Sequence, residues 1–469
     1  MLVPLKTKIV ATISDLNCSP GFIEKLHRAG MTVVSLNTAH MTHEDALKVV
    51  KDIRKVSDRI GILLDTKGPE IRTCESDSPL PVKCGQVIRI KGAPEKPSYG
   101  DIIHVSYEFF VRDVPVNSAI LVDDGFIALT VIKKDKEYLY CRVENDGTIH
   151  PRKSINIPSV HVTLPALSEK DRLFIEFAAD HDLDFIAHSF VRNKEDVFAV
   201  QSILDKKKSP IKIIAKIENA QGVQNLNEIL DHVYGVMIAR GDLAVEIPTE
   251  QIPLIQKDII SACIERRKPV IVATQMLNSM IEAPRPTRAE VSDVANACLD
   301  HTDALMLSGE TANGKYPEEA VKTMAKIALE VESKKSSYTD VSYSLENRVT
   351  AYLAKAAVKA ALRLNIKCIV ADSRTGNSIR ELAAYRGDSP IYAQVYDRRV
   401  VRLLSLSFGV FAEYSPMDIT APRPLRKKIC QLINENHFND EELIIILAGS
   451  FGAEHGASYI EISAAGNFR

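Results

Sequence analysis

Residues 211–248 read IKIIAKIENAQGVQNLNEILDHVYGVMIARGDLAVEIP and hold two short apolar runs, each of which ends in charge. The first run, KIIAKIE, ends in Lys216 and Glu218, and the second run, GVMIAR, is followed by Asp242. Near-continuous apolar runs of this length are typical of strands that are buried on both faces. Because buried charges are costly unless they are paired or bind something, these residues are either solvated strand ends or parts of a site.

The same strand-like run, followed by an amphipathic helical stretch, recurs eight times in the first 335 residues. The runs are TKIVATI (7–13), TVVSLN (32–37), GILLDT (61–66), FIAHSF (185–190), KIIAKIE (212–218), GVMIAR (235–240), VIVAT (270–274) and ALMLS (304–308). Apolar strands that alternate with crossover helices predict a parallel sheet covered on its outside. Eight such units predict a closed (β/α)8 barrel of the TIM type.

One insertion and one extension divide the chain further. Residues 68–164 lie between the third run and its helix, and their short alternating pieces, punctuated by Gly, Pro and Asp-Gly, predict an inserted all-β lid domain. The polar, Ser-rich stretch 333–344 predicts a linker. After the linker, strands and helices alternate again, which predicts a C-terminal α/β domain at 345–469 with a mostly parallel sheet. The predicted barrel domain is therefore 1–67 and 165–335.

The composition narrows the class of protein. Apolar residues make up 45% of the 469 residues and charged residues 26%, with a net charge of −2, as in globular proteins. The two signs of charge are interspersed, which gives no footprint for nucleic acid or an anionic membrane, and no run of 18 apolar residues could span a membrane. The start of the chain shows no signal peptide and the eight cysteines form no CxxC pair. These features predict a protein with inert thiols in the reducing cytoplasm.

Seven of the eight predicted strands end in polar or ionisable groups. In a (β/α)8 barrel the carboxyl ends of the strands meet at one rim, and active sites lie at that rim. The polar residues at these ends are Asn37, Asp65, Thr66, Ser189, Lys216, Glu218, Arg240, Asp242, Thr274, Ser308 and Glu310. Any one of them could be a solvated strand end or a helix cap, but seven ends that converge on one rim predict a site.

The chemistry of the acidic and basic residues at this rim suggests a metal and an anion. Lys216 and Glu218 lie two residues apart on one strand, so their side chains point the same way, and Asp242 follows the next strand. Carboxylates without His or Cys favour Mg²⁺ or Mn²⁺, with positions left for water and an anionic substrate. The lysine could neutralise charge on a transferring phosphoryl group, and amides of Gly241 and Asp242 at a helix start would suit a carboxylate or phosphate. The alternative is a structural ring of ion pairs.

Six longer segments resemble the pyruvate kinase family. They are LDTKGPEIRT (64–73), LPALSEKD (164–171), IAKIEN (214–219), ARGDLAVEIP (239–248), VATQMLNSMIEAPRPTRAEVSDVANACLD (272–300) and LMLSGETANGKYPEEAV (307–321). The resemblance runs along nearly the whole chain and implies a barrel with a β lid after strand 3 and a C-terminal α/β domain. It also implies a glycolytic enzyme, a homotetramer, that transfers a phosphoryl group from phosphoenolpyruvate to ADP, giving pyruvate and ATP. Divalent and usually monovalent cations would assist.

The resemblance implies a role for individual residues. Lys216 would stabilise the transferring phosphoryl group, Ser308 would belong to the proton relay to the enolate, and Glu218 and Asp242 would hold Mg²⁺ or Mn²⁺. The residues implied to contact phosphoenolpyruvate are Ser189, Lys216, Thr274 and the amides of Gly241 and Asp242. The residues implied to face the nucleotide are Arg72, Lys153 and Asp123. The residues implied to bind K⁺ are Asn37, Asp65 and Thr66, and Glu70 accompanies potassium dependence in the family.

Two loops of the C-terminal domain resemble the family's loops for a sugar-phosphate effector. The first, SRTGNS (373–378), joins a predicted strand to a helix, where small residues and hydroxyls suit a phosphate group. Its candidate residues are Ser373, Thr375, Gly376 and Ser378. The second, AGSFGAEHGAS (448–458), is rich in glycine. Since such loops also occur without a ligand, effector binding and an unliganded loop are both open.

Two segments depart from the family pattern. SLNTAH (35–40) stands where the family usually has R-L-N-F-S-H, so Ser35 replaces an arginine that handles phosphates and Ala39 replaces a serine that binds the monovalent cation. SDLN (14–17) replaces the usual G-P-A-S beside the nucleotide. Ser35 motivates one alternative to an active enzyme, a catalytically impaired ligand-binding relative. A second alternative is a metal-dependent lyase of oxo acids, because such barrels also hold Mg²⁺ between a Glu and an Asp.

Overall fold

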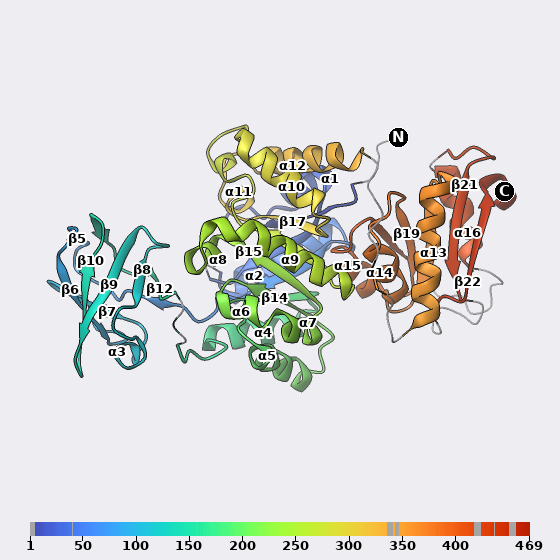
Figure 1. Cartoon of the computed structure of the whole chain (residues 1–469). Helices are drawn as coiled ribbons and strands as arrows, with labels where there is room; N and C mark the ends of the chain where they lie inside the picture. The colour runs from blue at the N-terminus through green and yellow to red at the C-terminus, as the bar shows by residue number, and fades with distance from the viewer. Residues whose placement is uncertain are drawn as a thin grey trace.

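The structure is a computed structural model. It describes residues 5–39, 41–158, 160, 162–334, 341–342, 347–416, 424–435, 437–449 and 456–469. Figure 1 shows a central barrel with a β domain on one side and an α/β domain on the other. Within these described ranges, no helix combines the length and the apolar composition needed to cross a membrane.

Eight parallel strands close into the barrel in the order β1-β17-β16-β15-β14-β13-β3-β2. The strands are β1 (Lys8–Thr12), β2 (Met31–Asn37), β3 (Gly61–Asp65), β13 (Phe185–His188), β14 (Lys212–Ile217), β15 (Gly235–Ala239), β16 (Val270–Ala273) and β17 (Ala304–Leu307). Alternate residues such as Val33, Leu63 and Ile214 fill the interior, and the residues between them pack against the surrounding helices. The predicted (β/α)8 barrel is therefore confirmed.

Helices cover the outside of the barrel, and several of them begin at a polar residue whose side chain caps the first turn. They are α1 (Pro20–Ala29), α2 (His43–Val56), α4 (Glu169–Asp180), α5 (Lys194–Lys206), α6 (Ala220–Gln224), α7 (Leu226–His232), α9 (Ile252–Glu265), α10 (Arg288–Leu299) and α12 (Pro317–Glu332), with the short α8 (Arg240–Glu246) and α11 (Gly309–Ala312) at the rim. Capping boxes at Thr42, Ser168 and Thr287 satisfy the first free amides of α2, α4 and α10. Helices α6 and α7 are separated at Asn225, whose side-chain amide donates to the Arg192 carbonyl at 2.8 Å.

The lid domain follows β3 and is all-β apart from α3 (Phe110–Asp113), as predicted. Its strands are β4 (Ile71–Arg72), β5 (Leu80–Val82), β6 (Val87–Gly92), β7 (Ile102–Val105), β8 (Ala119–Val122), β9 (Ile127–Lys134), β10 (Leu139–Val143), β11 (Gly147–Ile149) and β12 (Ser154–Asn156). Seven of them form one sheet with its own core. The chain enters the lid through Gly68, where φ is 73° and a Cβ would lie 2.7 Å from a ring carbon of Phe190, so only glycine fits.

The C-terminal domain is a five-stranded sheet in the order β20-β19-β18-β21-β22, parallel except for β22, which matches the mostly parallel sheet predicted. Its strands are β18 (Ile369–Ser373), β19 (Ile391–Val395), β20 (Val410–Tyr414), β21 (Leu443–Ala448) and β22 (Tyr459–Ala464). Its helices are α13 (Arg348–Leu364), α14 (Asn377–Ala384), α15 (Arg398–Leu404) and α16 (Pro424–Glu435). Most of the predicted linker at 333–344 lies outside the described residues, and the exact domain boundaries stay a prediction.

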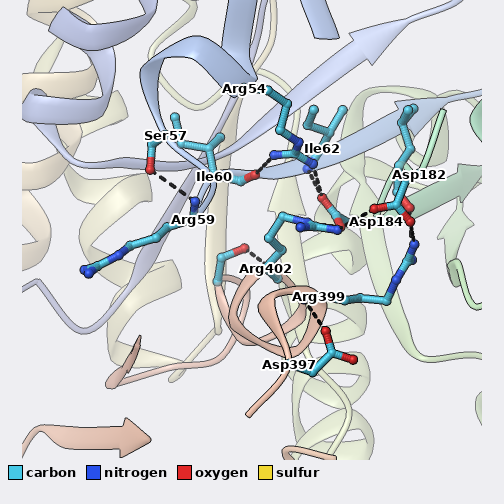
Figure 2. Close-up of polar contacts among 12 residues, drawn as sticks. Arg54, Ser57, Arg59, Ile60, Ile62, Asp182, Asp184, Asp397, Arg399 and Arg402 are labelled. Atoms are coloured by element: carbon cyan, nitrogen blue, oxygen red, sulfur yellow. Dashed lines mark hydrogen bonds and ion pairs between the residues drawn. The ribbon is translucent and has the colours of Figure 1, made fainter. Parts of the chain in front are cut away.

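The C-terminal domain closes the amino-terminal end of the barrel. Leu403 and Leu406 belong to the same core cluster as the residues that line the barrel interior. Beside them, Asp184 just before β13 is fully buried and accepts hydrogen bonds from Arg54 Nη2 at 2.9 Å and from Arg402 Nε of α15 at 2.6 Å (Figure 2). The amide of Ile62 also donates to this carboxylate, at 2.9 Å.

A second buried aspartate precedes β17 on the same end of the barrel. Asp303 accepts two hydrogen bonds from Arg386, at 2.9 and 2.6 Å, and one from each of the amides of Val270 and Phe408. At the amino-terminal end of the barrel, Arg386 and Arg402 of the C-terminal domain, together with Arg54 of α2, thus neutralise the two buried aspartates. The opposite rim, at the carboxyl ends of the strands, is left open for a site.

Candidate active site

Lys216 stands at the centre of the open rim. Its ammonium lies 3.0 Å from Asp65 Oδ1 and 3.1 Å from Glu218 Oε1, and it donates to Ser189 Oγ at 2.8 Å. Burial alone would lower the pKa of Lys216, but the carboxylates of Asp65, Glu218 and Asp242 outweigh it and raise the pKa above its usual value. The lysine is therefore a fixed positive charge across the physiological range.

The two carboxylates assigned to a divalent metal lie beside this lysine. Burial raises the pKa of Glu218 to about 7, which Lys216 opposes and Asp242 reinforces, and Glu218 Oε2 accepts the Phe190 amide at 2.6 Å. Burial also raises the pKa of Asp242. Such a surplus of buried negative charge suits a divalent cation. In the described part of the chain no three His, Cys, Asp or Glu side chains form a ready-made metal cage, so any ion here would keep water or substrate as further ligands.

The residues implied to bind K⁺ come from neighbouring strands. Asn37 pairs with Asp65 in the β2–β3 register, and Thr66 follows directly. Thr66 Oγ1 accepts the Ser189 amide at 3.0 Å, while Ser189 Oγ donates to the Thr66 carbonyl at 2.6 Å. Asn37 Oδ1 accepts the amide of Ala39 at 3.0 Å. The structure brings Asn37, Asp65 and Thr66 together at the ends of β2 and β3, and a role in binding K⁺ stays a prediction.

Thr274 lies in a strained turn beside the start of α8. Its φ is 68°, an outlier for a β-branched residue, and Gln275 follows with φ of 56°. Thr274 Oγ1 accepts the amide of Gly241 at 2.8 Å and donates to the Ala273 carbonyl at 2.6 Å. In this structure the amide of Gly241 donates to the Thr274 hydroxyl, and its role in receiving a substrate carboxylate stays a prediction.

Ser308 ends β17 at the same rim. Its amide donates to Glu310 Oε2 at 2.8 Å, and the other oxygen of Glu310 accepts the Leu277 amide at 3.1 Å. Glu310 is buried and holds the Ser308 turn against the segment after Thr274. Of the polar strand ends, Glu310 therefore has a structural role, whereas Ser308 remains a candidate for the proton relay.

The nucleotide candidates lie between the lid and the barrel. Arg72 and Lys153 line a cavity of about 400 Å³ that Asp123 and Asp242 also line. Lys153 Nζ lies 3.0 Å from Asp123 Oδ1, and Arg72 Nε donates to Glu70 Oε2 at 2.6 Å. Both cations thus line a space that Asp242 of the rim also lines, where they could pair with the phosphates of a nucleotide.

Several residues of this cavity were not found from the sequence. They are Asp124, Ser154, Asn156, Phe190, Arg192, Asn219 and Glu246. Four of them lie in the lid or in α8 and not at the ends of the barrel strands, where the sequence predicts a site; they are Asp124, Ser154, Asn156 and Glu246. Their one sequence signal is proximity to a recognised segment, as Asn219 has in IAKIEN and Ser154 has beside Lys153.

Ser35, which departs from the family pattern, points into the barrel. It is fully buried and pairs with Leu63 of the interior and with Thr12 of β1. Its hydroxyl has no hydrogen-bond partner, and neither has that of Thr12 beside it. Ser35 and Asn37 share one face of β2, because side chains alternate between the two faces of a strand.

The candidate effector loop lies at the start of α14. Gly376 has φ of 81° and its amide donates to Ser373 Oγ at 2.9 Å, while Thr375 is exposed. Ser378 Oγ donates to the Asp372 carbonyl at 3.4 Å. The second loop, 448–458, falls largely outside the described residues.

A buried histidine adjoins the site, and we expect it to make stability sensitive to acid. His188 is fully buried without a hydrogen-bond partner, and burial lowers its pKa from 6.5 to about 4 against the opposing pull of Asp196 and Asp171. Between pH 6.5 and 4 the unfolded chain binds a proton that the folded chain does not, so stability falls as pH falls. From pH 7 to pH 5, the free energy of unfolding of the His188→Leu variant should therefore fall by about 2 kcal/mol less than that of the unaltered protein.

Thermal unfolding across this pH range measures the difference. The exposed His150→Leu is the control, and it should follow the unaltered protein. Parallel pH curves for His188→Leu and the unaltered protein would contradict the expectation.

The chain matches known proteins over its whole length. Sequence models of the pyruvate kinase barrel domain and of the pyruvate kinase alpha/beta domain match residues 5–321 and 352–463. A pyruvate kinase of Borreliella burgdorferi is 45% identical over 464 residues, which cover 97% of both chains. A pyruvate kinase of Staphylococcus epidermidis is 42% identical over 468 residues, which cover 97% of this chain and 79% of the relative.

A solved structure agrees with these sequences. The crystal structure of a pyruvate kinase from Cryptosporidium parvum superposes with a TM-score of 0.92 at 34% identity, and the match covers 98% of this chain and 96% of the other. The barrel, the lid and the C-terminal domain are all included in that overlap. On sequence and on structure, this chain belongs to the pyruvate kinase family of phosphotransferases.

Proposed function

We propose that the rim around Lys216 transfers the phosphoryl group of phosphoenolpyruvate to ADP, giving pyruvate and ATP. The observation that carries this assignment is one buried lysine among three carboxylates, beside a cavity lined by Arg72 and Lys153. The positive charge of Lys216 would stabilise negative charge on the phosphoryl group during its transfer. The two cations of the cavity wall would hold the phosphates of the nucleotide.

The family depends on a divalent metal, and we assign its site to Glu218 and Asp242. Mg²⁺ or Mn²⁺ fits their hard oxygens, and the ion, when bound, would neutralise charge on the phosphoryl oxygens. The proximity of Asn37, Asp65 and Thr66 at the ends of β2 and β3 supports a K⁺ site there.

The remaining rim residues would orient phosphoenolpyruvate and supply its proton. Ser189 and Thr274 present hydroxyls beside Lys216 and Gly241, and they would line the pocket of the substrate carboxylate. The amides of Gly241 and Asp242 at the start of α8 would donate to that carboxylate once the Thr274 hydroxyl turns away from Gly241. Ser308 would relay the proton that converts the enolate to pyruvate.

The reaction is tested by a direct assay. Pyruvate and ATP should form from phosphoenolpyruvate, ADP and Mg²⁺, with each omission stopping the reaction. Tight binding of phosphoenolpyruvate without turnover would instead support the impaired relative. Cleavage of an oxo acid that needs Mg²⁺ but no ADP would support the lyase.

Removing one proposed metal ligand should abolish most of this activity. Asp242→Ala is expected to weaken apparent Mg²⁺ affinity and to cut kcat/KM by more than the roughly 10- to 100-fold that outer-shell changes cost. Asp258→Ala is the control, because Asp258 is an exposed aspartate on α9 outside this cavity and should leave the Mg²⁺ titration unchanged. Near-normal activity of Asp242→Ala at low Mg²⁺, with the fold intact by circular dichroism, would refute the assignment.

We also propose that the loop at 373–378 binds the phosphate of a sugar-phosphate effector. The exposed hydroxyl of Thr375 and the left-handed Gly376 at the start of α14 support this. A sugar phosphate should then lower the apparent KM for phosphoenolpyruvate, and Thr375→Glu should abolish the effect by placing a negative charge against the phosphate. Thr375→Ser is the control that keeps the hydroxyl. Flat kinetics across a panel of phosphorylated metabolites would rule the site out.

The assembly and the location of the protein are two further proposals. Family resemblance supports a homotetramer, which light scattering of the purified protein would measure. All eight cysteines are free thiols, and five of them are buried, which supports the reducing cytoplasm.

A further inference from the structure

Arg240 follows β15 directly, but its side chain makes structural contacts instead of reaching for substrate. Nη1 and Nη2 donate to the two oxygens of Asp293 on α10, at 2.6 and 2.8 Å. Nη2 also donates to the Thr274 carbonyl at 2.9 Å, and it lies 2.8 Å from the sulfur of Met276. The Arg240 side chain is only 13% exposed. One guanidinium therefore joins α8, the turn after β16 and helix α10.

The turn that Arg240 holds is the strained one. A positive φ at a threonine persists only where its surroundings fix the backbone. The Thr274 carbonyl is fixed by Arg240, and the Thr274 hydroxyl is fixed by the amide of Gly241, the residue next to Arg240. The bond from Arg240 to the Thr274 carbonyl and the bond from the Gly241 amide to the Thr274 hydroxyl thus hold the start of α8 against the turn after β16.

A lysine could not make the same set of contacts. The guanidinium meets both oxygens of one carboxylate and still has a hydrogen for a carbonyl, because its donors lie in a rigid plane. A lysine at this position would keep the charge and lose the fork. The arrangement thus depends on geometry more than on charge.

We propose that Arg240, oriented by Asp293, is a positioning residue that sets where Thr274 Oγ1 and the Gly241 amide stand relative to the substrate. Arg240 does not touch the reacting atoms and acts through Thr274 and Gly241. The inference rests on the proposed roles of those two residues in the site, and it extends the machinery to a pair that lies behind them.

The test is a double-mutant cycle between Arg240→Lys and Thr274→Val. Arg240→Lys should lower kcat by about tenfold or more while the KM for ADP changes less than twofold. If Arg240 acts through Thr274, the double variant should be no slower than Thr274→Val alone. Losses that multiply, or an Arg240→Lys enzyme with unchanged kcat, would overturn the inference.

The single variants separate this inference from the proposed function. A Thr274→Val enzyme with unaltered kcat would show that Thr274 has no catalytic role, and the cycle would then be additive and would overturn the inference as well. A slow Thr274→Val combined with additive losses would leave the function standing and remove only the role of Arg240.

A second variant and a matched pair guard against simple unfolding. Asp293→Asn keeps the size of the side chain but weakens the bidentate pair, so it should show a smaller loss of the same kind, with coupling to Thr274→Val. The control pair is Arg89 and Asp101 in the lid, joined by bonds of 2.7 and 3.1 Å. Arg89→Lys and Asp101→Asn should leave kcat unchanged, and a comparable loss there would overturn the inference.

Discussion

Lys216→Met is expected to lower kcat for phosphoryl transfer from phosphoenolpyruvate to ADP by about 10³-fold, at the upper end of what loss of one preorganised donor costs. Methionine keeps most of the buried stem and removes the charge that faces Asp65 and Glu218. Phosphoryl transfer should suffer far more than the enolisation of pyruvate, because the charge of the lysine meets the moving phosphoryl group. Exchange of pyruvate methyl protons into heavy water, followed by nuclear magnetic resonance, measures the second reaction.

The same strand offers a control for that experiment. Lys212 lies four residues before Lys216 and on the same face of β14, but near the closed end of the barrel. Lys212→Met should therefore turn over at close to the normal rate. Equal slowing of both reactions by Lys216→Met, or equal slowing by the two lysine variants, would contradict the role assigned to Lys216.

Asp184→Ala is expected to lower the free energy of unfolding by about 3–5 kcal/mol, the usual cost of removing one partner from a buried ion pair. The substitution leaves Arg402 Nε and the Ile62 amide without their acceptor, inside the junction between the barrel and the C-terminal domain (Figure 2). Calorimetry measures the shift. Asp180→Ala, which removes the exposed partner of Lys207 on a neighbouring helix, should cost less than about 1 kcal/mol. Similar losses for the two variants would contradict the importance of the buried pair.

The fold was largely predictable because the barrel repeats one local pattern eight times. Each barrel strand begins and ends within two residues of its apolar run, since burial on both faces leaves few polar residues until the strand ends. The lid was harder to predict strand by strand. Strands β4 and β12, with two and three residues, are too short to show an alternating pattern and are set by pairing with partners distant in sequence.

The candidate site was predictable in part for a similar reason. Lys216 and Glu218 follow from spacing on one strand, and the structure places them in contact. The direction of Arg240 could not be predicted, because it depends on Asp293 more than fifty residues later in the chain. The hydrogen bond between Gly241 and Thr274 likewise depends on a backbone turn with positive φ, and a threonine in the sequence does not predict such a turn.

The closure of the barrel by the C-terminal domain has a consequence for how the protein is made. Arg386 follows Asp303 by 83 residues, and Arg402 follows Asp184 by 218 residues. All eight barrel strands are therefore synthesised well before Arg386 and Arg402, which pair with the two buried aspartates. Until then, Asp303 lacks its arginine, Asp184 has only Arg54 as a cationic partner, and the apolar end of the barrel where Leu403 and Leu406 will pack is uncovered. We therefore expect the last steps of barrel folding to wait for residues 386–406, in contrast to the usual order in which each domain folds as a unit during synthesis.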